Sequence, residues 1–199
     1  MDALDSLEDI GIAVKLLGNY RPRRKFARRW LSRSAVGLYL NESPDDGVSV
    51  LMIKRAQRAG DPWSGHMAFP GGRRDREDRN TLATAKRETR EEIGLDADAH
   101  ARLIGRLSDV MTHPRLRTGP MIITPYLFRL HARPPLSPNH EVDEIVWVPL
   151  RFLADRSNRQ KMRWAPNGVP IELPCYLYRE RRIWGLSLMM LDELLAALL

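Results

Sequence analysis

The chain has 199 residues, of which 43% are hydrophobic and 29% are charged, with 32 Lys and Arg against 25 Asp and Glu. These values are ordinary for a globular protein, and the length suits one domain with a sizeable core. The single cysteine, Cys175, excludes an internal disulfide framework and suits a reducing compartment, so we expect a cytoplasmic protein.

Neither end of the chain suggests contact with a membrane. The first nine residues carry four acids and no basic residue, which does not resemble a secretory signal. The longest apolar run, residues 186–199, is interrupted by Asp192 and Glu193 and is too short to span a bilayer. We therefore expect no membrane partner.

The N-terminal region divides into a helix and a basic connector. Residues 4–17 show helical apolar spacing. The seven basic residues that follow have no acid between them: Arg21, Arg23, Arg24, Lys25, Arg28, Arg29 and Arg33. A solvated connector is the favoured interpretation, and an arm that contacts phosphate or RNA is the alternative. We assign residues 1–33 to this helix and connector and residues 34–199 to the main domain.

Strands follow the connector. Residues 34–40 and 48–55 alternate apolar and polar side chains like paired strands, and the turn formers at 41–47 join them. Residues 56–65 are expected to form a loop, and residues 66–70 a short strand that leads to Gly71 and Gly72.

A loop and a helix come next. Gly71 and Gly72 predict a loop whose backbone approaches a ligand closely. Asn80 or Thr81 is the expected N-cap, and Gly94 ends the helix. The apolar or small residues that recur at helical spacing on its buried side are Leu82, Ala85, Thr89 and Ile93.

Three acids share one side of this helix: Glu88, Glu91 and Glu92. Like charges at spacings of three and four residues weaken a helix by roughly 0.2–0.5 kcal/mol per pair, so a bound cation would explain the cluster. Carboxylate oxygens suit Mg²⁺, Mn²⁺ and Ca²⁺. Arg87 is expected to point away from the acids. The alternative interpretation is a solvated helix rich in Glu and Arg.

The C-terminal half continues with mixed elements. Residues 101–110, 121–130 and 144–148 read as strands, residues 149–153 as a short helix, residues 171–184 as a hairpin, and residues 186–199 as a final helix. Helices outside a mixed sheet predict an α/β fold of the α/β/α sandwich type.

The segment from Gly72 to Leu95 resembles the Nudix box: glycine, five residues, Glu, seven residues, then Arg-Glu-apolar-any-Glu-Glu-any-Gly-apolar. The matching residues are Arg87, Glu88, Glu91, Glu92, Gly94 and Leu95. Thr89 departs from the pattern at the apolar position. The loop is one residue longer than the pattern, so Asp78, or alternatively Glu77, replaces the first Glu. The resemblance covers residues 34–199 approximately and implies the Nudix fold.

The resemblance also implies a metal-dependent hydrolase of diphosphates. Glu88, Glu91 and Glu92 would be both catalytic residues and ligands of Mg²⁺ or Mn²⁺, and the Gly71 carbonyl would add a ligand. A divalent cation offsets the repulsion between a diphosphate and its nucleophile and activates water. Arg87 would hold the loop and the glutamates through ion pairs, with Asp78 as a partner.

Other candidates are less specific. Glu141 is our choice for an extra ligand or general base, with Asp143 and Glu144 as alternatives. The stretch that contains them is similar to a Glu-Val-any-Glu-any-any-Trp-Val-Pro-Leu pattern of the family. The candidate substrate contacts are Arg55, Gly72, His66 and His113. A lone histidine is more often structural or merely exposed.

The substrate is suggested by two further stretches. Residues 51–56 with 65–72, and residues 182–186, are similar to segments of coenzyme A pyrophosphatases, although an insert at residues 61–64 changes the spacing. Coenzyme A or a derivative therefore ranks first among nucleotide diphosphates. The alternatives are ADP-ribose, dinucleotides or nucleotide sugars, an RNA 5′ end, or a nucleotide-binding Nudix module without turnover. The apolar helices at the two ends either pack on the domain or form the contact of a homodimer.

Overall fold

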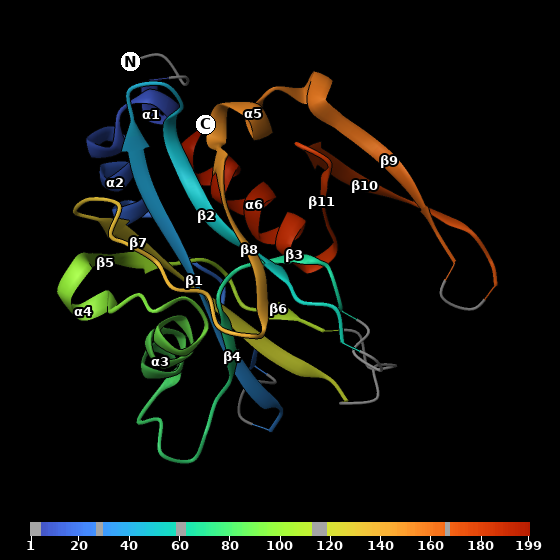
Figure 1. The fold of residues 1–199 in the computed structure, drawn as a ribbon, viewed down its shortest axis with the longest axis horizontal. Helices are drawn as coiled ribbons and strands as arrows, with labels where there is room; N and C mark the ends of the chain where they lie inside the picture. The colour runs from blue at the N-terminus through green and yellow to red at the C-terminus, as the bar shows by residue number, and fades with distance from the viewer. Residues whose placement is uncertain (1–4, 27–29, 59–62, 113–118, 166–167) are drawn as a thin grey trace.

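The computed structural model describes residues 5–26, 30–58, 63–112, 119–165 and 168–199. Helices lie on both faces of a large mixed sheet, and a second, smaller sheet extends from one side (Figure 1). The predicted α/β class and mixed sheet are therefore confirmed. His113 and the basic residues Arg28 and Arg29 fall outside the described residues, so the predictions that name them have no structural outcome.

The large sheet has eight strands. Five of them lie in the order β3-β2-β1-β7-β5, while β4 pairs with β1, β6 with β7 and β8 with β2. Only β1 and β7 pair in parallel among the described pairings. The strand bounds are β1 Ser32–Ser43, β2 Gly47–Arg55, β3 Met67–Ala68, β4 Gly71–Arg73, β5 Ala101–Arg106, β6 Val110–Met111, β7 Met121–Leu130 and β8 Val142–Pro149.

The two faces of this sheet bury separate apolar clusters. On β2, Leu51 and Ile53 pack with Ile93 of the helix α3 (Thr81–Ile93). Val50 and Met52 point the other way and join a cluster that includes α2 (Ile10–Asn19) and α6 (Gly185–Leu198). Successive side chains of a strand point to opposite faces, so a strand covered on both faces is apolar throughout. The sandwich of helices around the sheet follows from this burial.

The N-terminal region forms two helices where one was predicted. α1 (Asp5–Glu8) and α2 are divided at Asp9, whose carboxylate accepts hydrogen bonds from the amides of Gly11 and Ile12. Local capping of this kind stabilises a new helix start. Leu7 and Leu17 are buried in the same cluster as α6. The proposed division of the chain at residue 33 stays a prediction.

Three short helical segments complete the elements: α4 Ala97–His100, α5 Leu150–Ala154 and the 3₁₀ turn η2 Arg156–Asn158. The predicted strand at residues 101–110 is wrong beyond Arg106, because β5 ends there and β6 begins only at Val110. Among the described residues, no helix is both long enough and apolar enough to cross a membrane.

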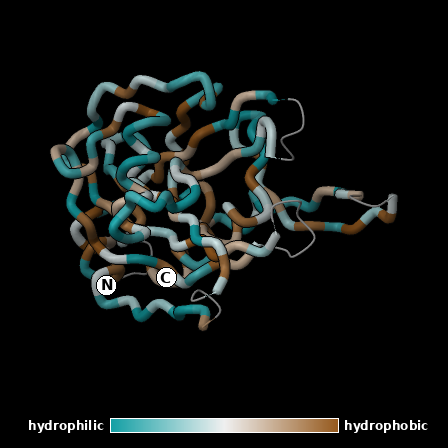
Figure 2. The backbone as a smooth tube through the Cα atoms, turned by 90° about the horizontal axis from the view of Figure 1, so that it is seen from below, coloured by the Kyte–Doolittle hydropathy of each residue, from teal (hydrophilic) through white to brown (hydrophobic). Residues whose placement is uncertain are grey.

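The second sheet has three antiparallel strands in the order β11-β10-β9, and the β9–β10 hairpin projects from the body (Figures 1 and 2). Its strands are β9 Arg159–Trp164, β10 Ile171–Tyr178 and β11 Arg181–Trp184. The predicted hairpin at residues 171–184 is confirmed as β10 and β11. β9 was not predicted, because its sequence RQKMRW carries little apolar pattern and its strand conformation depends on pairing with β10.

Candidate active site

The two glycines ahead of α3 lie in a strand, so the predicted loop is wrong at this point. Gly71 pairs with Val36 and Gly72 with Ala35. Gly71 has φ +150°, and a Cβ there would collide with the Ala35 carbonyl. A Cβ at Gly72 would collide with the Glu88 carboxylate. Gly71 therefore needs glycine because the backbone of β1 approaches β4 closely, whereas a Cβ at Gly72 would displace the carboxylate of Glu88.

Glu92 is the most buried acid of the helix, with 4% of its surface exposed. The Gly71 amide donates a 2.8 Å hydrogen bond to its Oε2. The pKa of Glu92 is raised to about 7: burial is the main cause, the negative charges of Glu88 and Glu141 add to it, and the Gly71 amide and the positive charge of Arg55 oppose it. Arg55 and Glu141, both predicted site residues, therefore lie within electrostatic reach of Glu92.

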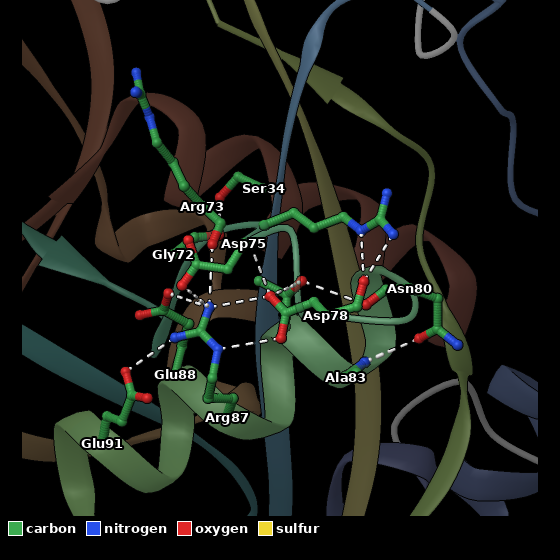
Figure 3. A network of polar contacts seen from close by, with 12 residues as sticks. Ser34, Gly72, Arg73, Asp75, Asp78, Asn80, Ala83, Arg87, Glu88 and Glu91 are labelled. Atoms are coloured by element: carbon green, nitrogen blue, oxygen red, sulfur yellow. Dashed lines mark hydrogen bonds and ion pairs between the residues drawn. The ribbon is translucent and has the colours of Figure 1, made fainter.

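Arg87 does not point away from the acids, contrary to the prediction from helical spacing, whereas the ion pairs with Asp78 and the glutamates that the family resemblance implied are confirmed. Its Nη1 lies 3.0 Å from Glu91 Oε2, and its Nη2 lies 2.9 Å from Glu88 Oε1 (Figure 3). Its Nε and Nη2 each lie 3.1 Å from an oxygen of Asp78. An arginine side chain is long enough to span a helical turn. The position of Arg87 along the helix therefore did not determine where its guanidinium group lies.

Asp78 is the loop acid that meets the helix. It is 6% exposed and also accepts hydrogen bonds from the Thr84 hydroxyl and the Asp75 amide. The Arg87 guanidinium lowers the pKa of Asp78 from 3.8 to about 2. Glu77, the alternative for this position, is exposed. Of the two acids, the structure brings Asp78 into contact with Arg87.

Thr89 occupies the position where the Nudix box has an apolar residue, and it is fully buried. Its hydroxyl donates to the Ala85 carbonyl at 2.7 Å and accepts from the Tyr39 hydroxyl at 3.1 Å. Both polar groups are satisfied, so the departure from the pattern leaves no unpaired hydroxyl in the interior.

Two residues that hold this region were missed by the sequence reasoning. The Ser34 hydroxyl donates to the Gly72 carbonyl, both of which are labelled in Figure 3. The Arg74 guanidinium donates two hydrogen bonds to the Asp78 carbonyl, at 2.7 and 3.1 Å. Ser34 lies on β1, where a polar residue at a buried position is a detectable signal. Arg74 gave no signal, because exposed loop arginines are common.

The remaining candidates are placed as follows. Glu141 pairs with Arg58 at 3.2 Å, whereas its alternatives Asp143 and Glu144 pair with basic residues of β2 and β11. The His66 ring packs edge-on against Trp184 of β11, with 4.9 Å between centroids. Their catalytic or substrate roles stay predictions.

The donor set fits a hard divalent cation. Glu88 and Glu92 lie against adjacent residues of β4, so carboxylate and backbone oxygens are close together there. Glu91 is 55% exposed and bound to Arg87. Within the described residues, no three His, Cys, Asp or Glu side chains are already gathered as metal ligands. Ligation by all three glutamates would therefore require exchange of the Arg87 ion pairs.

A mixed sheet between helices, with an acidic helix against a glycine strand, defines a class of α/β proteins whose site suits metal-bound phosphates. A family model described as the NUDIX domain matches residues 31–167, more than half of the chain. The chain therefore belongs to the Nudix family of hydrolases.

Curated relatives support this assignment. The chain is 34% identical over 146 residues to the human mitochondrial coenzyme A diphosphatase NUDT8, covering 71% of this chain and 59% of the relative. For the NUDT8 protein of Mus musculus the identity is 31% over 144 residues, covering 71% and 67%. An uncharacterised protein of Schizosaccharomyces pombe is 39% identical over 107 residues, 52% of this chain and 32% of its own length. The chain thus spans only part of these relatives.

Solved structures agree on the fold. A MutT/nudix family protein from Enterococcus faecalis matches with a TM-score of 0.54 at 19% identity, covering 90% of this chain and 62% of that chain. A Nudix hydrolase from Alicyclobacillus acidocaldarius matches with a TM-score of 0.51 at 19% identity, covering 83% and 91%.

Proposed function

We propose that the protein is a Mg²⁺- or Mn²⁺-dependent hydrolase that cleaves the diphosphate of a nucleoside diphosphate compound. The observation that carries the proposal is the buried carboxylate of Glu92, held by the Gly71 amide beside Glu88. A buried acid whose pKa lies near 7 is costly to keep charged without a cation beside it. The Nudix membership supports the same reaction.

Each residue has a stated role in this proposal. Glu88 and Glu92 would hold the cation, and Glu91 would join them after leaving Arg87. The cation, when bound, offsets the charge of the diphosphate and lowers the pKa of a ligated water. Arg87 and Asp78 fix the helix to its loop, and Arg55 places a positive charge on the same side. Glu141 is the proposed general base.

Coenzyme A or a derivative is the first candidate substrate. The names of the mouse and human relatives, coenzyme A diphosphatases, support it together with the similar stretches at residues 51–56, 65–72 and 182–186. ADP-ribose, dinucleotides and capped RNA are the alternatives to be tested beside it. We also propose a cytoplasmic location on the basis of the single cysteine, whereas the names of these relatives favour a mitochondrion. Imaging of the tagged protein decides between them.

The replacement of Glu92 by Gln tests the metal assignment. Glu92→Gln keeps the size of the side chain and an acceptor for the Gly71 amide but removes the charge. We expect a loss of activity of about 10²-fold or more, on the scale of electrostatic groups at active sites, in a Mg²⁺ assay with coenzyme A, ADP-ribose, a dinucleoside polyphosphate and capped RNA. Glu77→Gln, the same change at an exposed loop acid, serves as the matched control and should retain wild-type rates.

Two results would contradict the proposal. Wild-type rates in Glu92→Gln would show that Glu92 is not a ligand of the catalytic metal. Absence of turnover for every substrate, with Mg²⁺ or Mn²⁺, would favour the Nudix module that binds nucleotides without cleaving them.

A further inference from the structure

A second cleft lies away from the acidic helix. It has a volume of about 420 Å³ and lies between the β10–β11 hairpin and the ends of β2, β3 and β8. We call it the hairpin cleft. Its charged lining consists of Lys54, Glu144, Arg179, Glu180, Arg181 and Arg182. Four positive charges and two negative ones line it, and the pairing of Lys54 with Asp143, which lies outside the lining, reduces the positive excess to one.

The hairpin cleft is on the opposite face of the large sheet from α3. Met52 belongs to the apolar cluster on the α6 side and Ile53 to the cluster on the α3 side. Strand alternation places Lys54 with Met52, and Glu144 is its cross-strand partner. Arg55 follows a register shift and pairs with Val142, which belongs to the cluster on the α3 side, and its charge acts on Glu92. The hairpin cleft is therefore separate from the carboxylate site.

Two arginines of the hairpin cleft take no part in its ion pairs among the described residues. Lys54 pairs with Asp143 at 2.6 Å, and Arg181 makes a bidentate pair with Glu144. The charge of Glu180 also acts on Arg181. Within the part of the chain that the structure describes, Arg179 and Arg182 have no carboxylate partner, and Arg179 lies over the ring of its neighbour Tyr178. Unpaired guanidinium groups at a cleft are suited to a bound anion.

The turn that carries Arg179 is held in a strained conformation. Arg179 has φ +46° and Glu180 has φ +68°, and they are the only non-glycine residues with positive φ among those described. Such two-residue turns normally use Asn and Gly. Arg181 holds this turn in place by donating to the Arg179 carbonyl and to Glu144 of β8. Strained backbone that surrounding contacts enforce occurs preferentially at ligand sites.

We propose that the hairpin cleft binds a phosphomonoester group, with Arg179 and Arg182 as its phosphate ligands. The planar guanidinium group matches phosphate oxygens in a bidentate manner. The volume suits a ligand of nucleotide size. The phosphomonoester belongs either to the far end of the substrate or to a separate phosphorylated molecule. The assignment of the phosphomonoester to the substrate rests on the proposed function, whereas the binding of a phosphomonoester in the hairpin cleft does not.

A physical connection joins the hairpin cleft to the glycine strand. Arg182 lies two residues before Trp184, whose ring contacts His66. His66 leads into β3, and the Ser187 hydroxyl donates to the Met67 carbonyl at 2.9 Å. β3 continues to β4, which holds Glu92 through the Gly71 amide. A ligand in the hairpin cleft therefore contacts elements that are continuous with the carboxylate site.

Binding is tested with adenosine 3′,5′-bisphosphate, which has phosphomonoesters but no diphosphate to cleave. Calorimetry without divalent cations should show binding of this compound and not of adenosine. Arg179→Gln/Arg182→Gln should lower the affinity at least tenfold. Both side chains are exposed and lack ion pairs, and Gln at position 179 adds no strain that Arg lacks, so the variant should fold.

Arg102→Gln/Arg163→Gln is the matched control, since it removes two exposed arginines outside the hairpin cleft. It should retain the wild-type affinity. The site would be overturned if the wild type showed no binding at millimolar concentration, or if the cleft variant kept the wild-type affinity. It would also be overturned by an equal loss of affinity in both variants, because the net charge of the protein alone would then explain the binding.

Kinetics with Mg²⁺ then identify the source of the phosphomonoester. If it belongs to the substrate, the cleft variant raises the KM for coenzyme A at least tenfold and leaves the KM for 3′-dephospho-coenzyme A unchanged. If it belongs to a separate molecule, both KM values stay unchanged, and the bisphosphate alters turnover of the dephospho compound by the wild type only. Absence of turnover for every substrate would contradict the proposed function. Calorimetry would still show whether the hairpin cleft binds a phosphomonoester.

Discussion

Arg87 is the residue around which the acidic region is arranged. Its single guanidinium group contacts Asp78 of the loop and Glu88 and Glu91 of the helix. It does not contact Glu92 in any described hydrogen bond or ion pair, so the most buried acid depends on Gly71 and the charge of Arg55. The two halves of the acidic cluster are therefore stabilised by different groups, and a change in one need not destroy the other.

Replacement of Asp78 tests the stability of this arrangement. Asp78→Asn removes the charge that pairs with Arg87 in a buried position, and a pKa of about 2 instead of 3.8 corresponds to roughly 2 kcal/mol. We expect the free energy of unfolding at pH 7 to fall by about 1–3 kcal/mol in urea denaturation. Asp98→Asn, which breaks an exposed pair with Lys86, should cost at most about 1 kcal/mol.

The pH dependence of this effect has a definite sign. Folding lowers the pKa of Asp78, so its contribution to stability is complete above about pH 4 and is lost as the pH falls through about 2. The difference between wild type and Asp78→Asn should therefore be constant from pH 5 to 7 and shrink below pH 4. A difference that grows on acidification would show that another group carries the effect.

Among the elements, α3 is specified by local signals. Its N-cap Asn80 accepts from the Ala83 amide, and Gly94 ends it with φ +71°. Both ends were predicted from the sequence, because caps depend on residues within a few positions. β4 and β9 were missed for the opposite reason: each becomes a strand only by pairing with a distant segment.

The strained β10–β11 turn gives an element-scale prediction. Glycine adopts positive φ without steric cost, so Glu180→Gly should raise the free energy of unfolding by about 0.5–1 kcal/mol in urea denaturation. Glu172→Gly, in the β10 strand, should lower it, since glycine weakens a strand interior. Destabilisation by Glu180→Gly would mean that the side chain of Glu180 outweighs the strain.

For the whole molecule, the N-terminal helices are part of the core. Leu17 of α2 is 2% exposed and lies in the cluster that also holds α6. Leu17→Ala should lower the free energy of unfolding by about 2–5 kcal/mol, as for other buried leucines. Lys15→Ala, at an exposed position of the same helix, should change it by less than about 0.5 kcal/mol. A wild-type transition in Leu17→Ala would favour residues 1–33 as a separate unit.

The whole sheet also separates two chemically different surfaces. The α3 face carries the acidic site, and the α6 face carries the basic hairpin cleft. Neighbouring residues Lys54 and Arg55 serve different surfaces, at a register shift between β2 and β8: Lys54 lines the hairpin cleft, and the charge of Arg55 acts on Glu92. This arrangement keeps an anion bound in the hairpin cleft away from the glutamates while the strand order still links both sites.

The sequence alone determined the family resemblance, the acidic helix with its caps, and the strands β1, β2 and β7, because each depends on spacing within a short segment. The family resemblance implied that Arg87 pairs with Asp78 and the glutamates, whereas helical spacing turned Arg87 away from them. Only the tertiary structure decided between these two expectations, and only it made β4 a strand. It also decided that distant arginines of the β10–β11 hairpin form a cleft with β2 and β8. These outcomes depend on contacts between residues far apart in the chain, which the spacing of one segment does not encode.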